Sequence, residues 1–188
     1  MSLIFRNVFV ALVVWLGSTS GHAASNWTMD PAQSSLGFIG QQGSTEFEGR
    51  FADFNAEIAF SPDDLGNSSV RVEVDVTSAS TGTPERDSQL GATTWFNFAE
   101  FPKAVYQAEG FTADGDGYRA DGTLTLKGVS RDVPIEFTIA IDGDRAVAEG
   151  SGTLVRTNFE VGQGEFASGN TVALDVRVVF EIHANRSE

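Results

Sequence analysis

The feature that most constrains this chain is a strict alternation of residue types near its C-terminus. Every second residue from Val172 to Ile182 is a large apolar one, and charged residues such as Asp175 and Arg177 stand between them. Successive side chains of a β-strand point to opposite faces of the sheet. The alternation therefore predicts one long strand over Val172–Ala184 with a dry face and a wet face.

The same period of two recurs in four earlier segments: Phe47–Phe51, Phe54–Phe60, Val70–Val76 and Ile135–Ile141. Clusters typical of turns separate such segments: Ser61–Asp64, Asp114–Gly117, Lys127–Gly128 and Asp142–Asp144. The 20 Gly and 15 Phe residues suit this arrangement, because Gly is favoured in tight turns and aromatic residues are favoured in strands. The chain is therefore predicted to be all-β.

Pro84–Leu90 is the one segment with the pattern of a helix, with Thr83 as its N-cap and Glu85 in its first turn. The strands do not alternate with helices, as a parallel sheet would require. About eight amphipathic strands suit a closed antiparallel barrel or a sandwich, and we favour the barrel, which is wide enough for one small ligand. Composition leaves open whether Phe side chains fill its interior or line a cavity.

The first 23 residues have the pattern of a signal peptide. Arg6 gives a positive start, Val8–Leu16 is apolar, and the small residues before Ala24 suit a cleavage site. We expect cleavage after Ala23, with Ala24 as the alternative, so that residues 24–188 form one exported barrel domain in the periplasm. The chain has no Cys, so we expect neither a lipoprotein anchor nor disulfides.

The net charge of −14 argues against nucleic acid as a partner, because binding phosphates requires a basic surface. Anionic lipid surfaces would also repel the chain, so we expect encounters with proteins or with single extracted lipids.

The sequence offers little catalytic chemistry. Beyond the signal segment the only His is His183, which lies on the polar face of the last predicted strand. Asp114–Gly117 lacks the remaining ligands of a calcium loop. We therefore expect no enzyme, no metal and no cofactor. Arg156 and Asp87 stand out in their surroundings, and they either pair with one another structurally or contact a ligand.

Several motifs occur in an order that resembles the YceI-like family of polyisoprenoid-binding, lipocalin-like periplasmic barrels. They are Trp27, Asp30, Ser34, Phe38, Gly49–Phe51, Phe60–Pro62, Ser80–Gly82, Arg86–Asp87, Leu90, Trp95–Phe98, Phe101–Pro102, Gly122–Val129, Arg156 and Asn158–Phe159. The resemblance covers residues 27–184. It implies an eight-stranded antiparallel lipocalin-like barrel with a short capping helix and an apolar cavity for a long isoprenoid.

The chain departs from the family pattern at Gln42, where many members carry His, and at Glu160, where Gly is usual. Both departures concern the preference for a ligand head group. The sequence around Trp95–Phe96 and Gly122–Leu126 is similar to that of the branch of the family that occurs with cytochrome b561. That likeness implies a quinone ligand or a respiratory partner.

We therefore expect a periplasmic binding or carrier protein for an isoprenoid quinone, a polyprenyl lipid or a similar amphiphile. The alternative is an interaction protein with a filled barrel that docks on a membrane redox protein such as a cytochrome b561. A homodimer is compatible with either. The expected ligand-binding residues are Phe38, Phe47, Phe51, Phe54, Ile58, Val74, Asp87, Leu90, Trp95, Phe96, Tyr106, Leu124, Leu126, Phe137, Arg156, Phe159, Val176 and Phe180.

Overall fold

A computed structural model of the protein describes residues 24–187, so the expected signal peptide lies outside the described residues. Strands dominate the part that is described. They are β1 (Ser25–Met29), β2 (Ser35–Gln42), β3 (Thr45–Phe51), β4 (Phe54–Phe60), β5 (Ser69–Asp75), β6 (Ala79–Ser80), β7 (Lys103–Glu109), β8 (Phe111–Asp114), β9 (Gly117–Leu126), β10 (Val129–Asp142), β11 (Arg145–Val155) and β12 (Asp175–Arg186).

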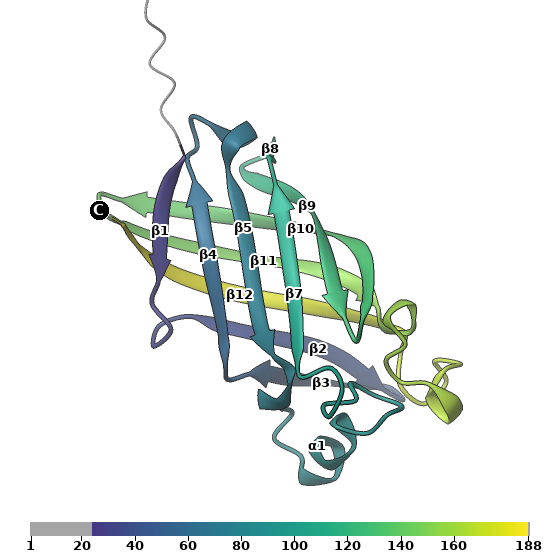
Figure 1. Ribbon diagram of the computed structural model, residues 1–188. Helices are drawn as coiled ribbons and strands as arrows, with labels where there is room; N and C mark the ends of the chain where they lie inside the picture. The colour runs from purple at the N-terminus through teal and green to yellow at the C-terminus, as the bar shows by residue number, and fades with distance from the viewer. Residues whose placement is uncertain (1–23, 188) are drawn as a thin grey trace, which may run out of the picture.

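Eight of these strands close into an antiparallel barrel (Figure 1). The order β1-β4-β5-β7-β9-β10-β11-β12 returns to β1, where Trp27 is the register partner of Ile58 on one side and of Arg186 on the other. The β2–β3 hairpin extends the wall next to β12, with Phe38 opposite Val178. The predicted barrel is confirmed, and a two-sheet sandwich is not formed.

The last strand begins later than the alternation predicts. β12 starts at Asp175, and Val172 makes only an isolated bridge to Gln42. Between them, the Arg156 N–H donates to the Leu174 carbonyl and the Ala173 N–H donates to the Gln41 carbonyl, each at 2.9 Å. Val172 and Val176 line the cavity but Leu174 does not, so the alternation predicted over Val172–Ala184 is interrupted at Leu174.

Two-residue turns connect the long strands where the sequence predicted turns. In the β9–β10 turn, Lys127 and Gly128 have φ of 50° and 75°, the left-handed conformation that matches the twist of hairpin strands. The buried Lys127 ammonium donates to the carbonyls of Thr93 and Glu160, each at 2.7 Å. These contacts connect the turn to two loops at the same end of the barrel.

The predicted helix is α1 (Pro84–Leu90), which lies at the lower end of the barrel (Figure 1). Thr83 occupies the N-cap position, but its side chain accepts no capping bond from the helix backbone. The helix is instead held by Asp87, which accepts hydrogen bonds from the Thr81 N–H, the Thr81 hydroxyl and the Ser80 hydroxyl at 2.6–2.8 Å. Within residues 24–187, no helix is long and apolar enough to cross a membrane.

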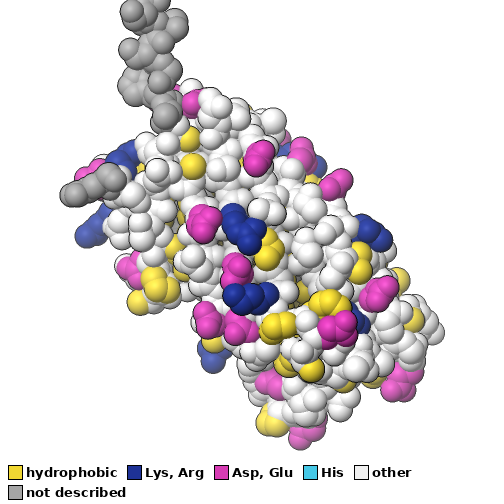
Figure 2. Space-filling model, in the orientation of Figure 1, with side chains coloured by type: hydrophobic (Ala, Val, Ile, Leu, Met, Phe, Trp, Pro, Cys, Tyr) yellow, Lys and Arg dark blue, Asp and Glu magenta, His cyan; other side chains and the backbone are white. Residues whose placement is uncertain are grey.

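The outer face is polar, as the alternation requires. Figure 2 shows acidic side chains scattered over the strands, with smaller numbers of Lys and Arg between them. On β5 and β7, Glu73 pairs with Arg71 and Lys103 at the surface. Exposed pairs of this kind contribute little to stability.

Candidate ligand cavity

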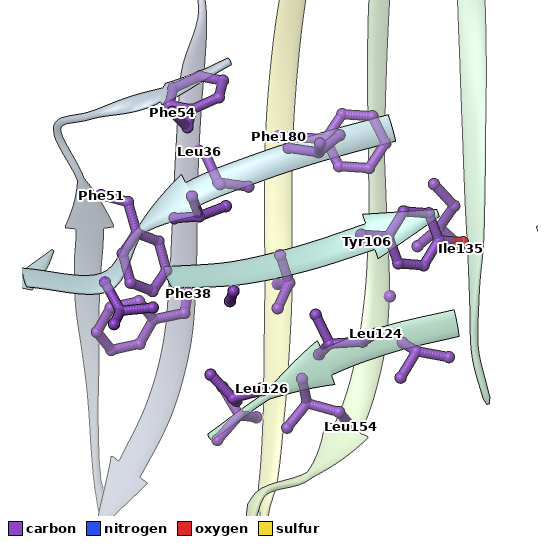
Figure 3. Close-up of a pocket in the computed structure, with 18 of the residues that line it drawn as sticks. Leu36, Phe38, Phe51, Phe54, Tyr106, Leu124, Leu126, Ile135, Leu154 and Phe180 are labelled. Atoms are coloured by element: carbon purple, nitrogen blue, oxygen red, sulfur yellow. The ribbon is translucent and has the colours of Figure 1, made fainter. Parts of the chain in front are cut away.

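The barrel encloses a cavity of about 600 Å³. Its wall is formed by the inward-facing, mostly apolar side chains of the long strands, and Figure 3 shows Leu36, Phe51, Leu124 and Phe180 around this space. Volumes of this size are typical of sites that bind small molecules.

The interior is hollow and not filled by its aromatic residues. Ile135, Val176 and Phe180 point into the barrel, yet each stays only partly buried because part of its surface faces the cavity. A packed core would leave almost no such surface. Of the two interiors that composition left open, the filled barrel is therefore wrong.

One end of the cavity is closed by aromatic rings. Phe60, only 2% exposed, lies 5.9 Å from Phe111, 5.2 Å from Tyr118 and 6.2 Å from Phe137 between ring centroids. Trp27 belongs to the same aromatic cluster, and its indole N–H donates to the Phe60 carbonyl at 3.0 Å. The cavity is therefore blind at this end.

The opposite end, beside α1, carries the polar part of the lining. Gln42, Glu85 and Gln89 line the cavity and are exposed to solvent as well. Arg86 and Thr83 add further polar groups at the same end. The cavity therefore opens between α1 and the end of β2.

Tyr106 lies midway along the wall, where its hydroxyl donates to the Ala120 carbonyl at 3.3 Å. Burial raises the pKa of the Tyr106 phenol, which keeps the group neutral. Its ring fits because Gly122 has no side chain: an added Cβ would lie 2.2 Å from the Tyr106 hydroxyl oxygen.

Arg156 is 2% exposed and borders the cavity, but its guanidinium is fully engaged. All five N–H groups donate to main-chain carbonyls at 2.5–2.9 Å, namely those of Val161, Gly162, Phe166, Val172 and Ala173. Burial lowers the pKa of Arg156. The residue thus fixes the β11–β12 connection and has no N–H left for a ligand.

Comparison with known proteins places this architecture in a family. The model of the YceI-like domain matches residues 27–184, almost the whole described barrel. The chain belongs to the YceI-like family. The YceI-like domain of this chain is thus the barrel with the apolar cavity described above.

Two curated relatives match part of the chain. "UPF0312" proteins of Yersinia pestis (strain Pestoides F) and Pseudomonas aeruginosa (strain LESB58) are 30% and 32% identical over 119 residues. In each case the match covers 60% of this chain and 62% of the relative's own length, which is less than two thirds.

Solved structures share the fold over more of the chain. Burkholderia cenocepacia BcnA superposes with a TM-score of 0.80 at 28% identity, covering 84% of this chain and 99% of BcnA. A polyisoprenoid binding domain from Saccharophagus degradans, implicated in plant cell wall breakdown, superposes with a TM-score of 0.67 at 16% identity, covering 88% of this chain and all of that domain.

Most of the ligand-binding residues expected from the sequence do line the cavity of this YceI-like barrel. They are Phe38, Phe47, Phe51, Phe54, Ile58, Val74, Leu90, Trp95, Phe96, Tyr106, Leu124, Leu126, Phe137, Arg156, Val176 and Phe180. The two that do not are Asp87 and Phe159.

The expected pairing of Asp87 with Arg156 is wrong. Asp87 is bonded to Ser80 and Thr81, and none of the salt bridges within residues 24–187 involves Arg156. Hydrogen bonds from Thr81 hold the pKa of Asp87 below its usual value. Asp87 therefore fastens α1 to the preceding loop.

Phe159 is 1% exposed and packs in the core with Val76 and Val161. Its place in the short helix at Arg156–Phe159 turns the ring away from the cavity wall and into that core.

Sequence reasoning missed the polar residues of the opening. Arg86 stands beside Asp87 in the family motif, but the motif gives no sign that Arg86 and not Asp87 lines the cavity. Val72 and Ile182 also line the cavity, and the alternation of residues in β5 and β12 could have assigned both to the inner face.

The ionisable residues that line the described cavity are Glu85, Arg86, Tyr106 and Arg156. Residues 24–187 contain no cluster of three or more His, Cys, Asp or Glu side chains arranged to hold a metal ion. His183 is not part of the lining, and its Nε2 lies 2.7 Å from Glu181 Oε1. What the cavity offers chemically is apolar contact along its length and polar groups at its opening.

Proposed function

We propose that this protein is a periplasmic carrier that holds an isoprenoid quinone, a polyprenyl lipid or a similar amphiphile in its barrel cavity, and that it is not an enzyme. The observation that carries this proposal is the hollow apolar interior, which is closed by aromatic rings at one end and open beside α1 at the other. An elongated ligand with a greasy tail and a more polar head has the matching distribution of polarity.

The free energy of transfer favours such a ligand. Burial of each CH₂ group stabilises a complex by about 0.8 kcal/mol, so a prenyl tail binds with few polar contacts. The structural neighbour from Saccharophagus degradans is described as a polyisoprenoid binding domain, which supports this ligand class for the shared fold.

The export and the partner rest on the sequence. The apolar segment Val8–Leu16 after Arg6 supports delivery to the periplasm. There the acidic surface would favour exchange of the lipid with a membrane redox protein, such as a cytochrome b561, over direct adsorption to anionic lipid. A homodimer is compatible with this role.

Extraction of a prenylquinone from vesicles tests the carrier function. Delipidated protein is incubated with phosphatidylcholine vesicles that contain the quinone, the vesicles are removed by flotation, and quinone in the protein fraction is quantified. We expect close to one bound quinone per protein molecule.

The matched control places one bulky residue on either face of β11. Ala148 lines the cavity, whereas Thr153 is exposed on the outer face. Ala148→Trp should abolish extraction and Thr153→Trp should leave it unchanged. No extraction by the unmodified protein, or equal extraction by both variants, would contradict the proposal.

A further inference from the structure

The opening beside α1 is the way into the cavity, because aromatic rings close the opposite end at Phe60. Gln42, the last residue of β2, lies on one side of this opening, and Arg86 of α1 lies on the other. Both residues line the cavity. A ligand that enters or leaves therefore passes between α1 and the β2–β3 hairpin.

The side chain of Arg86 reaches from α1 to the hairpin and so spans this opening. Its guanidinium carbon lies 4.1 Å from the centre of the Phe47 ring on β3, and its Nη2 donates to Gln42 Oε1 at 3.4 Å. On the helix side, Nη1 donates to Thr83 Oγ1 at 3.3 Å. We call Arg86 with its two hairpin partners, Phe47 and Gln42, the latch.

The hairpin side of the opening is fixed to the rest of the barrel. The Gly43 N–H donates to the Thr171 carbonyl, and the Ala173 N–H donates to the Gln41 carbonyl, each at 2.9 Å. The Arg156 side chain in turn donates to the Ala173 carbonyl at 2.8 Å. The hairpin is therefore tied to the β11–β12 connection, which Arg156 holds in place.

The helix side is tied mainly to its own neighbours in the chain. Asp87 accepts hydrogen bonds from the preceding loop, and the Leu90 carbonyl accepts one from the Phe96 N–H at 3.0 Å. In the described part of the chain, the bond from Arg86 to Gln42 is the only hydrogen bond between α1 and the hairpin. The latch therefore joins the less firmly held side of the opening to the fixed side.

We propose that the latch is a gate, which breaks each time a ligand enters or leaves the cavity, so that Arg86 sets the rate of ligand exchange. This inference rests on the carrier function proposed above. The latch joins two parts of the protein and does not include the ligand. Its removal should therefore lower the barriers to entry and to exit by similar amounts.

Stopped-flow fluorescence of all-trans-retinol, a fluorescent isoprenoid alcohol, measures association and release on delipidated protein. Arg86→Met removes the cation and its N–H donors but keeps an aliphatic side chain beside Phe47. Association and release should both be roughly ten-fold faster, because a cation–π contact and one long hydrogen bond no longer have to break. Arg177→Met, on the exposed outer face of β12, is the matched control and should keep the rates of the parent.

A reversible cross-link tests the gate from the opposite direction. The chain has no Cys, so two introduced cysteines react selectively. Gln42→Cys with Arg86→Cys, joined by a bis-maleimide that contains a disulfide, should stop retinol exchange, and cleavage by a reductant should restore it. The control pair is Gln41→Cys with Glu46→Cys, two exposed register partners within the hairpin that do not line the cavity. The same linker on this pair should leave exchange free.

The outcomes separate the gate from the carrier function. Rates of Arg86→Met equal to those of the parent, or free exchange in the protein cross-linked between positions 42 and 86, would overturn the gate while retinol still binds. Faster release with unaltered association would also overturn it, because Arg86 would then act as a contact of the bound ligand. If retinol does not bind the parent protein at all, the carrier proposal fails and the gate fails with it.

Discussion

The hollow interior predicts that two inward-facing phenylalanines have different effects on stability. Phe60 is packed among Phe111, Tyr118 and Phe137 at the closed end, whereas Phe180 lies on the open part of the wall. Phe60→Ala removes packed atoms and leaves a new hole. Phe180→Ala enlarges space that is already there.

The expected magnitudes follow from this difference. Losing the burial of one Phe side chain costs about 1.5–3 kcal/mol, and we expect Phe180→Ala to cost no more than this. A new hole of about 100 Å³ adds roughly 2 kcal/mol at about 24 cal/mol per Å³, so Phe60→Ala should cost about 3–5 kcal/mol. In a domain of this size the larger loss lowers Tm by roughly 6–20 °C.

The assay is denaturant unfolding of delipidated variants, combined with the quinone extraction described above. Phe180→Ala should weaken lipid retention more than Phe60→Ala although it destabilises the protein less. Equal losses of stability at both positions, with retention unchanged at both, would refute the hollow-barrel reasoning.

Three further outcomes follow from the same structure. Arg156→Gln should lower the free energy of unfolding by about 3 kcal/mol or more, because Gln replaces five N–H donors with two and each stranded carbonyl costs about 1 kcal/mol or more; a denaturant midpoint equal to that of the parent would contradict this. The lowered pKa of Asp87 means that its stabilising effect is complete above the unfolded value of about 3.9 and is lost as the pH falls through the folded value. Urea melts should therefore show Asp87→Asn less stable than the parent at pH 7, with the gap narrowing below about pH 4, and a pH-independent gap would count against this role. Gly122→Ala should destabilise the protein, because the added Cβ would lie 2.2 Å from the Tyr106 hydroxyl oxygen and 2.7 Å from the Gln107 carbonyl oxygen, and Tyr106→Leu in the same chain should restore only part of the lost stability; a denaturant midpoint of Gly122→Ala equal to that of the parent would count against this packing.

The barrel and most of its wall could be predicted because alternation is a local signal. A residue such as Val176 or Phe180 is assigned to the inner face by its parity within one strand, whatever its partner strand is. The start of β12 could not be predicted in this way, because the Arg156 side chain binds the carbonyls of Val172 and Ala173, and such a contact leaves no mark on the parity of residues in the sequence.

The polar contacts at the opening were less predictable. Arg156 binds backbone carbonyls, which every residue has, so no partner could be found in the sequence. The carboxylate of Asp87 seemed a natural partner by charge, yet hydroxyl and amide groups close to it in the chain satisfy it.

Organic extraction of the protein after gentle purification from its native host, followed by mass spectrometry of the extract, shows whether the barrel carries a lipid. We expect a prenyl lipid at close to one molecule per chain, and its loss from Ala148→Trp. An empty extract, together with an experimental structure whose interior is closed by side chains, would contradict it.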